Sequence, residues 1–264
     1  MSAAVETDLL GRAETQTPDR NYLYTLGRLG VIAILVAAWT LATRVTDLVP
    51  AVNETVITLA DGFVAGWVYP HLVSTVRAVI GGFLVASLIG FPAGFLIGRS
   101  PWLGQVFDPL VSGAFAVPRI IFFPILLRIF GVGESAEAAM AAISALFPIL
   151  ITTAAGVREV NPTLVKMGKS LNLSTWQMVG KIYVPAAAPS LMVGFRIGFS
   201  ISFIAVIIAE FFAAKAGLGL LVSRAYGLLQ LPRMYAVVLL IVLIALAGNL
   251  TLWLFERRLR AHVA

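Results

Sequence analysis

Charged side chains are scarce inside the apolar stretches of this sequence, and they are the first candidates for chemistry. Arg119, Arg196 and Glu210 each lie within a long hydrophobic segment. A charge at the depth of a bilayer is costly unless it is paired or hydrated, so such residues often mark a path for polar solutes. Arg119 follows a proline, at a break where a cation can meet an anionic solute. We predict that all three residues line a translocation path, with pairing to neighbouring side chains as the alternative.

No spacing in the sequence matches a catalytic or metal-binding site. The run Gly168, Lys169, Ser170 is like the end of a phosphate-binding loop, but position 163, where that motif requires a glycine, holds Thr163. The chain contains no cysteine and only two histidines, which are far apart in the sequence. We therefore predict a protein that is not an enzyme, has no metal or cofactor of its own and does not hydrolyse ATP by itself.

The most polar break in the chain is residues 161–185, which we call the elbow. It lies between two hydrophobic segments and holds three of the four lysines of the chain. Asn161 and Pro162 suit the cap and the first position of a helix. Asn172 suits the left-handed residue at which a helix ends. The elbow is therefore predicted to begin with a short helix.

A second short helix is predicted in the elbow. Ser174 and Gln177 form a capping-box pattern at its start, and Pro185 is predicted to end it. One face of the first helix is predicted to dock onto another protein, because its members recur at i, i+3, i+4 and i+7. These residues are Leu164, Met167, Gly168 and Leu171.

The elbow resembles the cytoplasmic coupling loop of ABC importer permeases. That family's pattern is Glu-Ala-Ala, three residues, Gly, nine residues, Ile, one residue and Leu-Pro. When this chain is aligned on Ile182 and Pro185, the Glu-Ala-Ala positions hold Lys166, Met167 and Gly168, and the glycine position holds Asn172. A lysine in the glutamate position reverses a charge.

The flanking segments resemble the sulfonate, nitrate and taurine branch of these permeases. The segments that carry this likeness are AVPRIIFFPILLRIFGVGE, VGFRIG and YVPAAAPSLMVGFRIGFSISFIAVIIAEFFAAKAGLGLLV. The likeness covers roughly residues 50–255. The branch handles small anions such as sulfonates and nitrate, and also vitamin precursors.

The resemblance also implies partners. It implies ABC ATPase subunits that bind ATP beneath the elbow, an extracytoplasmic solute-binding protein, and a second permease subunit, with a homodimer favoured over a heterodimer. The residues implied to couple to the ATPase are Leu164, Lys166, Met167, Gly168, Leu171, Asn172, Ser174, Gln177, Ile182 and Pro185.

The composition predicts an integral membrane protein. Of the 264 residues, 59% are hydrophobic and 12% are charged, and the mean hydropathy is +0.95. Soluble domains carry about 25% charged residues. The net charge of +6 comes from Lys and Arg placed beside the apolar segments. That pattern is typical of topology signals in a lipid bilayer and not of a nucleic-acid-binding groove.

An all-α fold with about six transmembrane helices is predicted, which the resemblance identifies as the type I ABC importer transmembrane fold with cytoplasmic coupling helices. The expected spans are residues 28–42, 74–97, 108–130, 136–157, 189–212 and 234–255, with the third interrupted by Pro118 and Pro124. A short interfacial helix is expected near residues 54–67 and a Gly-rich connection at 215–233.

One predicted span carries small residues at every fourth position. A stripe of this kind lets a neighbouring helix approach closely in lipid. Its members are Gly82, Ala86, Gly90, Gly94 and Gly98.

The positions of Lys and Arg predict the orientation. Eleven lie in segments on one side of the spans and five on the other. The positive-inside rule then places both termini and the elbow on the cytoplasmic side of the membrane, which we expect to be a bacterial plasma (inner) membrane. We predict a cytoplasmic tail over residues 1–27 without a cleavable signal peptide, a permease domain over 28–256 and a C-terminal tail over 257–264.

The leading interpretation is the transmembrane permease subunit of an ATP-driven ABC importer. The alternative is a stand-alone secondary transporter or channel, although six spans are few for a secondary transporter and no inverted repeat is evident. A membrane enzyme is disfavoured because no catalytic constellation is visible.

Overall fold

The computed structural model describes residues 19–263, and every regular element among them is a helix. Residues 1–18 of the predicted N-terminal tail lie outside the described part. The chain divides into two compact units, Met1–Glu54 and Thr55–Ala264, and each is considered by itself.

The described part of the first unit consists mainly of helix α2 (Asp19–Val45). This helix begins before the predicted start at residue 28, and its segment Thr25–Val45 is long and apolar enough to cross a bilayer. The indole N–H of Trp39, which lies within α2, donates a hydrogen bond to the carbonyl oxygen of Pro50 at 3.0 Å. This bond ties the segment that follows α2 back to the helix.

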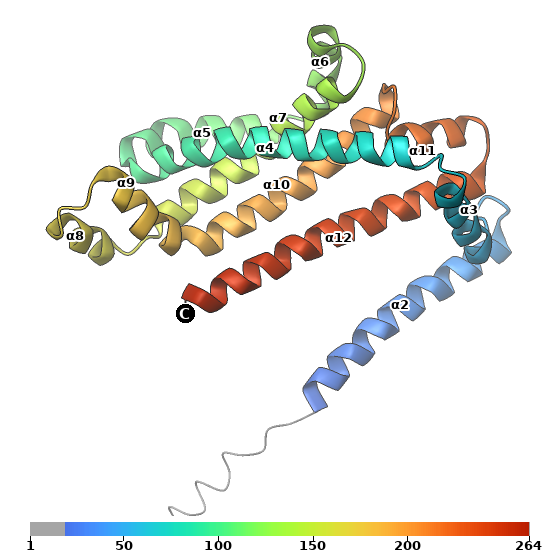
Figure 1. Ribbon diagram of the computed structural model, residues 1–264, viewed down its shortest axis with the longest axis horizontal. Helices are drawn as coiled ribbons and strands as arrows, with labels where there is room; N and C mark the ends of the chain where they lie inside the picture. Colours follow the sequence, from blue (N-terminus) through green and yellow to red (C-terminus); the bar gives the residue numbers. More distant parts are fainter. Residues whose placement is uncertain (1–18, 264) are drawn as a thin grey trace, which may run out of the picture. The chain divides into compact units, whose positions relative to one another are not determined.

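The second unit is built around three long helices, α4 (Tyr69–Arg99), α7 (Glu134–Arg158) and α10 (Val184–Phe212). Helix α7 packs against both α4 and α10, and α12 (Leu231–Val263) lies along α10 (Figure 1). These helices are apolar around most of their circumference, as expected of segments that face protein on one side and lipid on the other.

The predicted small-residue stripe brings α4 and α7 together. A Cβ atom added at Gly94 would lie 2.5 Å from the carbonyl oxygen of Leu150, and one at Gly98 would lie 2.6 Å from that of Ala154. Real Cβ atoms do not approach a carbonyl oxygen so closely. The glycines therefore allow the two backbones to touch, and the predicted role of the stripe is confirmed.

The predicted third span is a bent pair of helices. Helix α5 (Pro101–Ala116) is followed by a 3-10 turn, η1 (Arg119–Phe122), and by α6 (Phe123–Phe130). The two parts are bent by 82°. The break falls at Pro118, as predicted, whereas Pro124 lies in the first turn of α6, where its missing N–H costs nothing.

The predicted start of this span at residue 108 is wrong, because the helix begins at Pro101. The hydroxyl of Ser100 accepts a hydrogen bond from the N–H of Leu103 and caps the helix, and Pro101 suits the first helical position. The chain turns back into a helix after a single non-helical residue.

The predicted short helix and Gly-rich connection are both helical in part. Helix α3 (Val52–Val64) confirms the helix expected near residues 54–67. The connection contains α11 (Leu218–Gly227), which was not expected from its glycines. Gly217 has φ +132°, a conformation that favours glycine. Its turn lets Leu218 and Leu221 pack into a buried cluster.

In the described part of the chain, five helices are long and apolar enough to cross a membrane, or six if the bent pair forms one span. This agrees with the predicted all-α fold of about six spans. Large apolar side chains on their outer faces are exposed, such as Leu88 on α4 and Leu246 on α12. Lipid chains are as apolar as leucine, so such faces suit a bilayer.

Candidate functional site

The first helix of the elbow is α8 (Pro162–Ser170). The side-chain oxygen of Asn161 accepts a hydrogen bond from the N–H of Thr163 at 2.8 Å, so the predicted cap is confirmed. After the helix, Asn172 adopts φ 50°, the left-handed conformation predicted for the residue that ends it. Both ends of α8 are therefore defined by local sequence.

The second helix of the elbow begins at the predicted capping box. In α9 (Thr175–Met178), the Ser174 hydroxyl accepts from the N–H of Gln177 at 3.4 Å, and the Gln177 side chain accepts from the N–H of Ser174 at 2.8 Å. These reciprocal bonds satisfy two amide groups that a helix start otherwise leaves open. The capping box is confirmed.

The predicted end of this helix at Pro185 is wrong. A π-helical turn, η2 (Val179–Tyr183), follows α9 and leads directly into α10 at Val184. A proline inside an α-helix collides with the carbonyl group one turn earlier. That carbonyl belongs to Lys181, which lies in the wider π turn, and this accounts for a helix that continues through Pro185.

The predicted docking face of α8 is divided by the fold. Gly168 is buried, and a Cβ atom there would lie 2.5 Å from the sulfur of Met178 and would collide with the end of the Ile182 side chain. Ile182 is itself buried in the cluster beneath the elbow. Gly168 and Ile182 therefore hold α8 against the second helix, and they are not placed to contact a partner.

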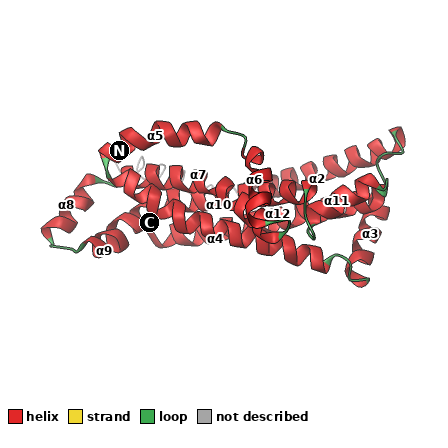
Figure 2. Ribbon diagram, turned by 90° about the horizontal axis from the view of Figure 1, so that it is seen from above, coloured by secondary structure: helices red, strands yellow, loops and turns green. Residues whose placement is uncertain are grey.

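The outer part of the elbow exposes four large apolar side chains, which we call the elbow surface. The exposed fractions are 39% for Leu164, 53% for Met167, 65% for Leu171 and 85% for Trp176. Helices α8 and α9 lie together beyond one end of α4, α7 and α10 (Figures 1 and 2). Trp176 was not among the predicted residues, although a tryptophan beside a capping box in a polar stretch was a visible signal.

The remaining predicted coupling residues are also exposed, and along the chain they lie between or next to the residues of the elbow surface. They are Lys166, Asn172, Ser174, Gln177 and Pro185. All the predicted coupling residues therefore lie in the protruding elbow, where Gly168 and Ile182 are buried and the others are exposed. Their role in coupling stays a prediction.

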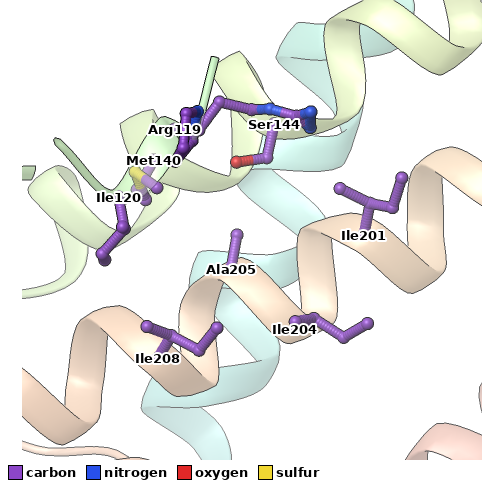
Figure 3. Close-up of a pocket in the computed structure, with 9 residues that line it drawn as sticks. Arg119, Ile120, Met140, Ser144, Ile201, Ile204, Ala205 and Ile208 are labelled. Atoms are coloured by element: carbon purple, nitrogen blue, oxygen red, sulfur yellow. The ribbon is translucent and has the colours of Figure 1, made fainter. Parts of the chain in front are cut away.

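A cavity of about 290 Å³ lies between the bent pair, α7 and α10 (Figure 3). Its wall is mostly apolar, and isoleucines of α10 face Arg119 and Ser144 across it. The lining residues are Pro118, Arg119, Ile120, Met140, Ser144, Ile201, Ile204, Ala205 and Ile208.

Arg119 is held at this cavity by its aromatic neighbour. Its Nη2 donates to the carbonyl oxygen of Phe115 at 2.8 Å, and its guanidinium carbon lies 4.6 Å from the centre of the Phe115 ring. A guanidinium has five N–H donors, and this bond uses one of them. Arg119 thus lines the cavity, and its role in a translocation path stays a prediction.

Arg196 is paired instead of facing this cavity. Its Nη1 lies 3.2 Å from Oε2 of Glu256, a residue of α12. The Glu256 side chain is 8% exposed. Arg196 is not part of the cavity wall at Arg119. The pairing alternative therefore describes Arg196 in this structure.

Glu210 is buried in a hydrogen-bonded lock and does not line the cavity. Its carboxylate accepts from the Thr75 hydroxyl at 2.7 and 3.0 Å and from the N–H of Gly219 at 2.8 Å. The Thr75 oxygen accepts from the N–H of Leu218 at 2.9 Å. Glu210 thus fastens the start of α11 to α4, at a helix N-terminus that favours a negative charge. The predicted path-lining role is not supported by this placement.

Glu137 is a second buried acid, and it was not singled out from the sequence. It is fully buried, and neither of its carboxyl oxygens has a hydrogen-bond partner among the residues described. Its position inside a predicted span was a signal, but its burial depends on the packing of α7. A carboxyl group without partners in such surroundings destabilises the fold.

Within residues 19–263, no group of three or more metal-ligating side chains is close enough to hold an ion. The described residues provide a mostly apolar cavity with Arg119 and Ser144 in its wall, the Arg196–Glu256 ion pair, the hydrogen bonds of Glu210, and a protruding apolar surface.

Comparison with protein families identifies a match over residues 86–261, to the family described as "Binding-protein-dependent transport system inner membrane component". The taurine transport system permease protein of Escherichia coli strain K12 is 27% identical over 240 residues, covering 88% of this chain and 87% of that protein. The riboflavin transport system permease protein of Chloroflexus aurantiacus is 29% identical over 195 residues, covering 74% and 73%.

Among solved structures, a chain of the MetNI methionine ABC transporter in an inward-facing conformation superimposes with a TM-score of 0.64. It covers 74% of this chain and 98% of its own length, at 16% sequence identity. At this identity the likeness concerns the fold, which is that of an ABC importer membrane subunit.

Proposed function

The chain belongs to the family of binding-protein-dependent transport system inner membrane components, and on this basis we propose that it forms the translocation path of an ATP-driven importer and couples that path to a separate ATPase. It is a multi-pass transport subunit, and ATP would be bound by the partner. Two such subunits, with a homodimer favoured, would enclose the path between them.

The observation that carries this proposal is the elbow. Its two helices have defined caps and are packed against each other through Gly168, so the elbow is a rigid body. It protrudes from one end of the bundle and exposes Met167, Leu171 and Trp176. Exposed apolar patches of this kind mark interaction sites, and tryptophan is enriched at the centres of interfaces.

The continuous helix after the elbow supplies a mechanical link. Because α9, η2 and α10 follow one another without a break, a displacement of the elbow is passed directly to α10. The same helix forms one wall of the cavity at Arg119. Movement of a docked ATPase would therefore shift a wall of the path, in the manner of a two-state bundle biased by ATP binding.

The substrate we propose is a small anion such as a sulfonate or nitrate. The support is the guanidinium of Arg119 at the cavity, together with the likeness to a taurine permease. A vitamin precursor is the competing substrate, because the riboflavin permease is similarly related. An extracytoplasmic solute-binding protein would deliver the substrate to the end opposite the elbow, with the elbow and both termini in the cytoplasm of a bacterial inner membrane.

The test is reconstitution. The full chain is placed in proteoliposomes with the ATPase subunit and the solute-binding protein encoded beside it, and ATP hydrolysis and uptake of radiolabelled taurine, nitrate and riboflavin are measured. We expect solute-stimulated hydrolysis and ATP-dependent uptake of one of the anions.

One outcome would overturn the ATP-driven mechanism, and another would overturn only the proposed substrate class. Uptake by the chain without any ATPase would establish the secondary transporter or channel instead. ATP-driven uptake of riboflavin but of neither anion would leave the importer in place and refute the substrate class.

A further inference from the structure

The elbow carries charge of one sign only. Residues 161–185 contain three lysines and no aspartate or glutamate. Lys166, Lys169 and Lys181 are all exposed. The stretch therefore presents a cationic surface around its apolar side chains.

Lysine and apolar side chains share the outer side of α8. Val165 and Gly168 face inward, since Gly168 is buried against the second helix and Val165 packs against the same cluster. At about 100° per residue, Lys166 and Met167 both lie on the side away from this pair. Both are exposed. Around that side, Lys166 and Lys169 lie next to each other on one flank, and Met167, Leu171 and Leu164 lie together on the other flank.

The position of the elbow favours a protein over a lipid surface as the occupant. The helices of the elbow extend beyond the end of the long helices (Figure 2). An interface between proteins has apolar anchors at its centre and charged groups at its rim. The elbow offers both, because its apolar side chains and its three lysines are exposed.

We propose that the docking groove of the ATPase partner has an acidic rim that pairs with Lys166, Lys169 and Lys181 around an apolar centre filled by Met167, Leu171 and Trp176. This inference rests on the proposed function, because it describes the partner of that same site. Rim charges of opposite sign accelerate association and exclude partners whose rim is basic. The elbow would thereby select its own ATPase.

The experiment measures binding of the ATPase subunit encoded beside this chain to the full chain in nanodiscs of zwitterionic lipid, at low and high salt. The variants are Lys166→Glu, Lys169→Glu, Lys181→Glu and the triple reversal. Lys215→Glu is the matched control, since Lys215 is the fourth lysine of the chain and lies between α10 and α11. Trp176→Ala separates the apolar contribution from the charges.

We expect each elbow reversal to weaken binding about fivefold at low salt. The triple reversal should invert the salt dependence, because its glutamates and the acidic rim repel each other most strongly at low salt. Lys215→Glu should bind like the wild type, and Trp176→Ala should weaken binding at every salt concentration. Lysine substitutions of the rim acids in the ATPase should restore binding to the triple variant.

The acidic rim is refuted if the reversals leave ATPase binding unchanged while Trp176→Ala weakens it. It is equally refuted if the reversals reduce only the affinity of the chain for vesicles of anionic lipid, which would assign the lysines to the membrane. If the wild-type chain binds no ATPase and stimulates no hydrolysis, the proposed function itself fails.

Discussion

Removing the buried carboxylate of Glu210 should lower the free energy of unfolding of the protein and leave the cavity at Arg119 unchanged. In Glu210→Ala, the Gly219 N–H loses its acceptor inside a fully buried site, and the Thr75 hydroxyl keeps only the carbonyl oxygen of His71 at 3.1 Å. Each unsatisfied buried donor costs about 1–3 kcal/mol, and the space left by the side chain adds to this. We expect a loss of about 4 kcal/mol in the free energy of unfolding.

Glu210→Gln is the milder variant, and the structure shows why. The amide keeps one acceptor oxygen and the shape of the side chain. The Thr75 hydroxyl also lies 3.1 Å from the carbonyl oxygen of His71, so it can donate there and accept from the new amide group. We therefore expect Glu210→Gln to cost only about 1–2 kcal/mol.

The assay is the fraction of folded protein that remains after heating in detergent, measured by size-exclusion chromatography. A loss of 1 kcal/mol lowers the melting temperature by about 2–4 °C for a chain of this size, so Glu210→Ala should melt about 10 °C lower. Glu134→Ala is the control, because Glu134 is an exposed acid at the start of α7. If Glu210→Ala melts like the wild type but transports nothing, Glu210 lines the path and the lock has been misread.

Three further outcomes are expected. Gly94→Ala should separate α4 from α7 and lower the melting temperature, whereas Gly113→Ala, where an added Cβ meets nothing within 4 Å, should not; equal melting would refute the close approach. Leu171→Asp should lower solute-stimulated ATP hydrolysis with unchanged melting, while Gly168→Ala should disturb the elbow itself; the reverse pattern would mean that the outer face is misassigned. Arg119→Ala should raise KM for an anionic solute about tenfold with intact folding, and unchanged uptake would remove Arg119 from the path.

Features that depend on neighbours in the sequence were predictable. The cap at Asn161, the capping box at Ser174 and the left-handed Asn172 each involve residues within one helical turn, and all three are confirmed. The small-residue stripe was also readable, because its period places every member on one face of α4. The long apolar segments also predicted an all-helical membrane fold, because hydropathy is a property of neighbouring residues in the sequence.

Which face of a helix meets which neighbour was not predictable. The spacing placed Gly168 beside Leu171 on one apolar face, but only the folded elbow shows that Gly168 packs inward while Leu171 stays exposed. Similarly, Pro185 reads as a helix end, and the π turn before it allows the helix to continue. Local signals leave these alternatives open.

The sequence alone determined that this chain is a helical membrane protein with a capped, lysine-bearing elbow, because hydropathy and capping act over a few residues. Only the tertiary structure decided the roles of its buried charges. Arg196 pairs with Glu256 and Glu210 with Thr75, partners that are 60 and 135 residues away in the chain. A charge in an apolar segment must find a partner or water, and which of the two it finds depends on the helices that pack around it.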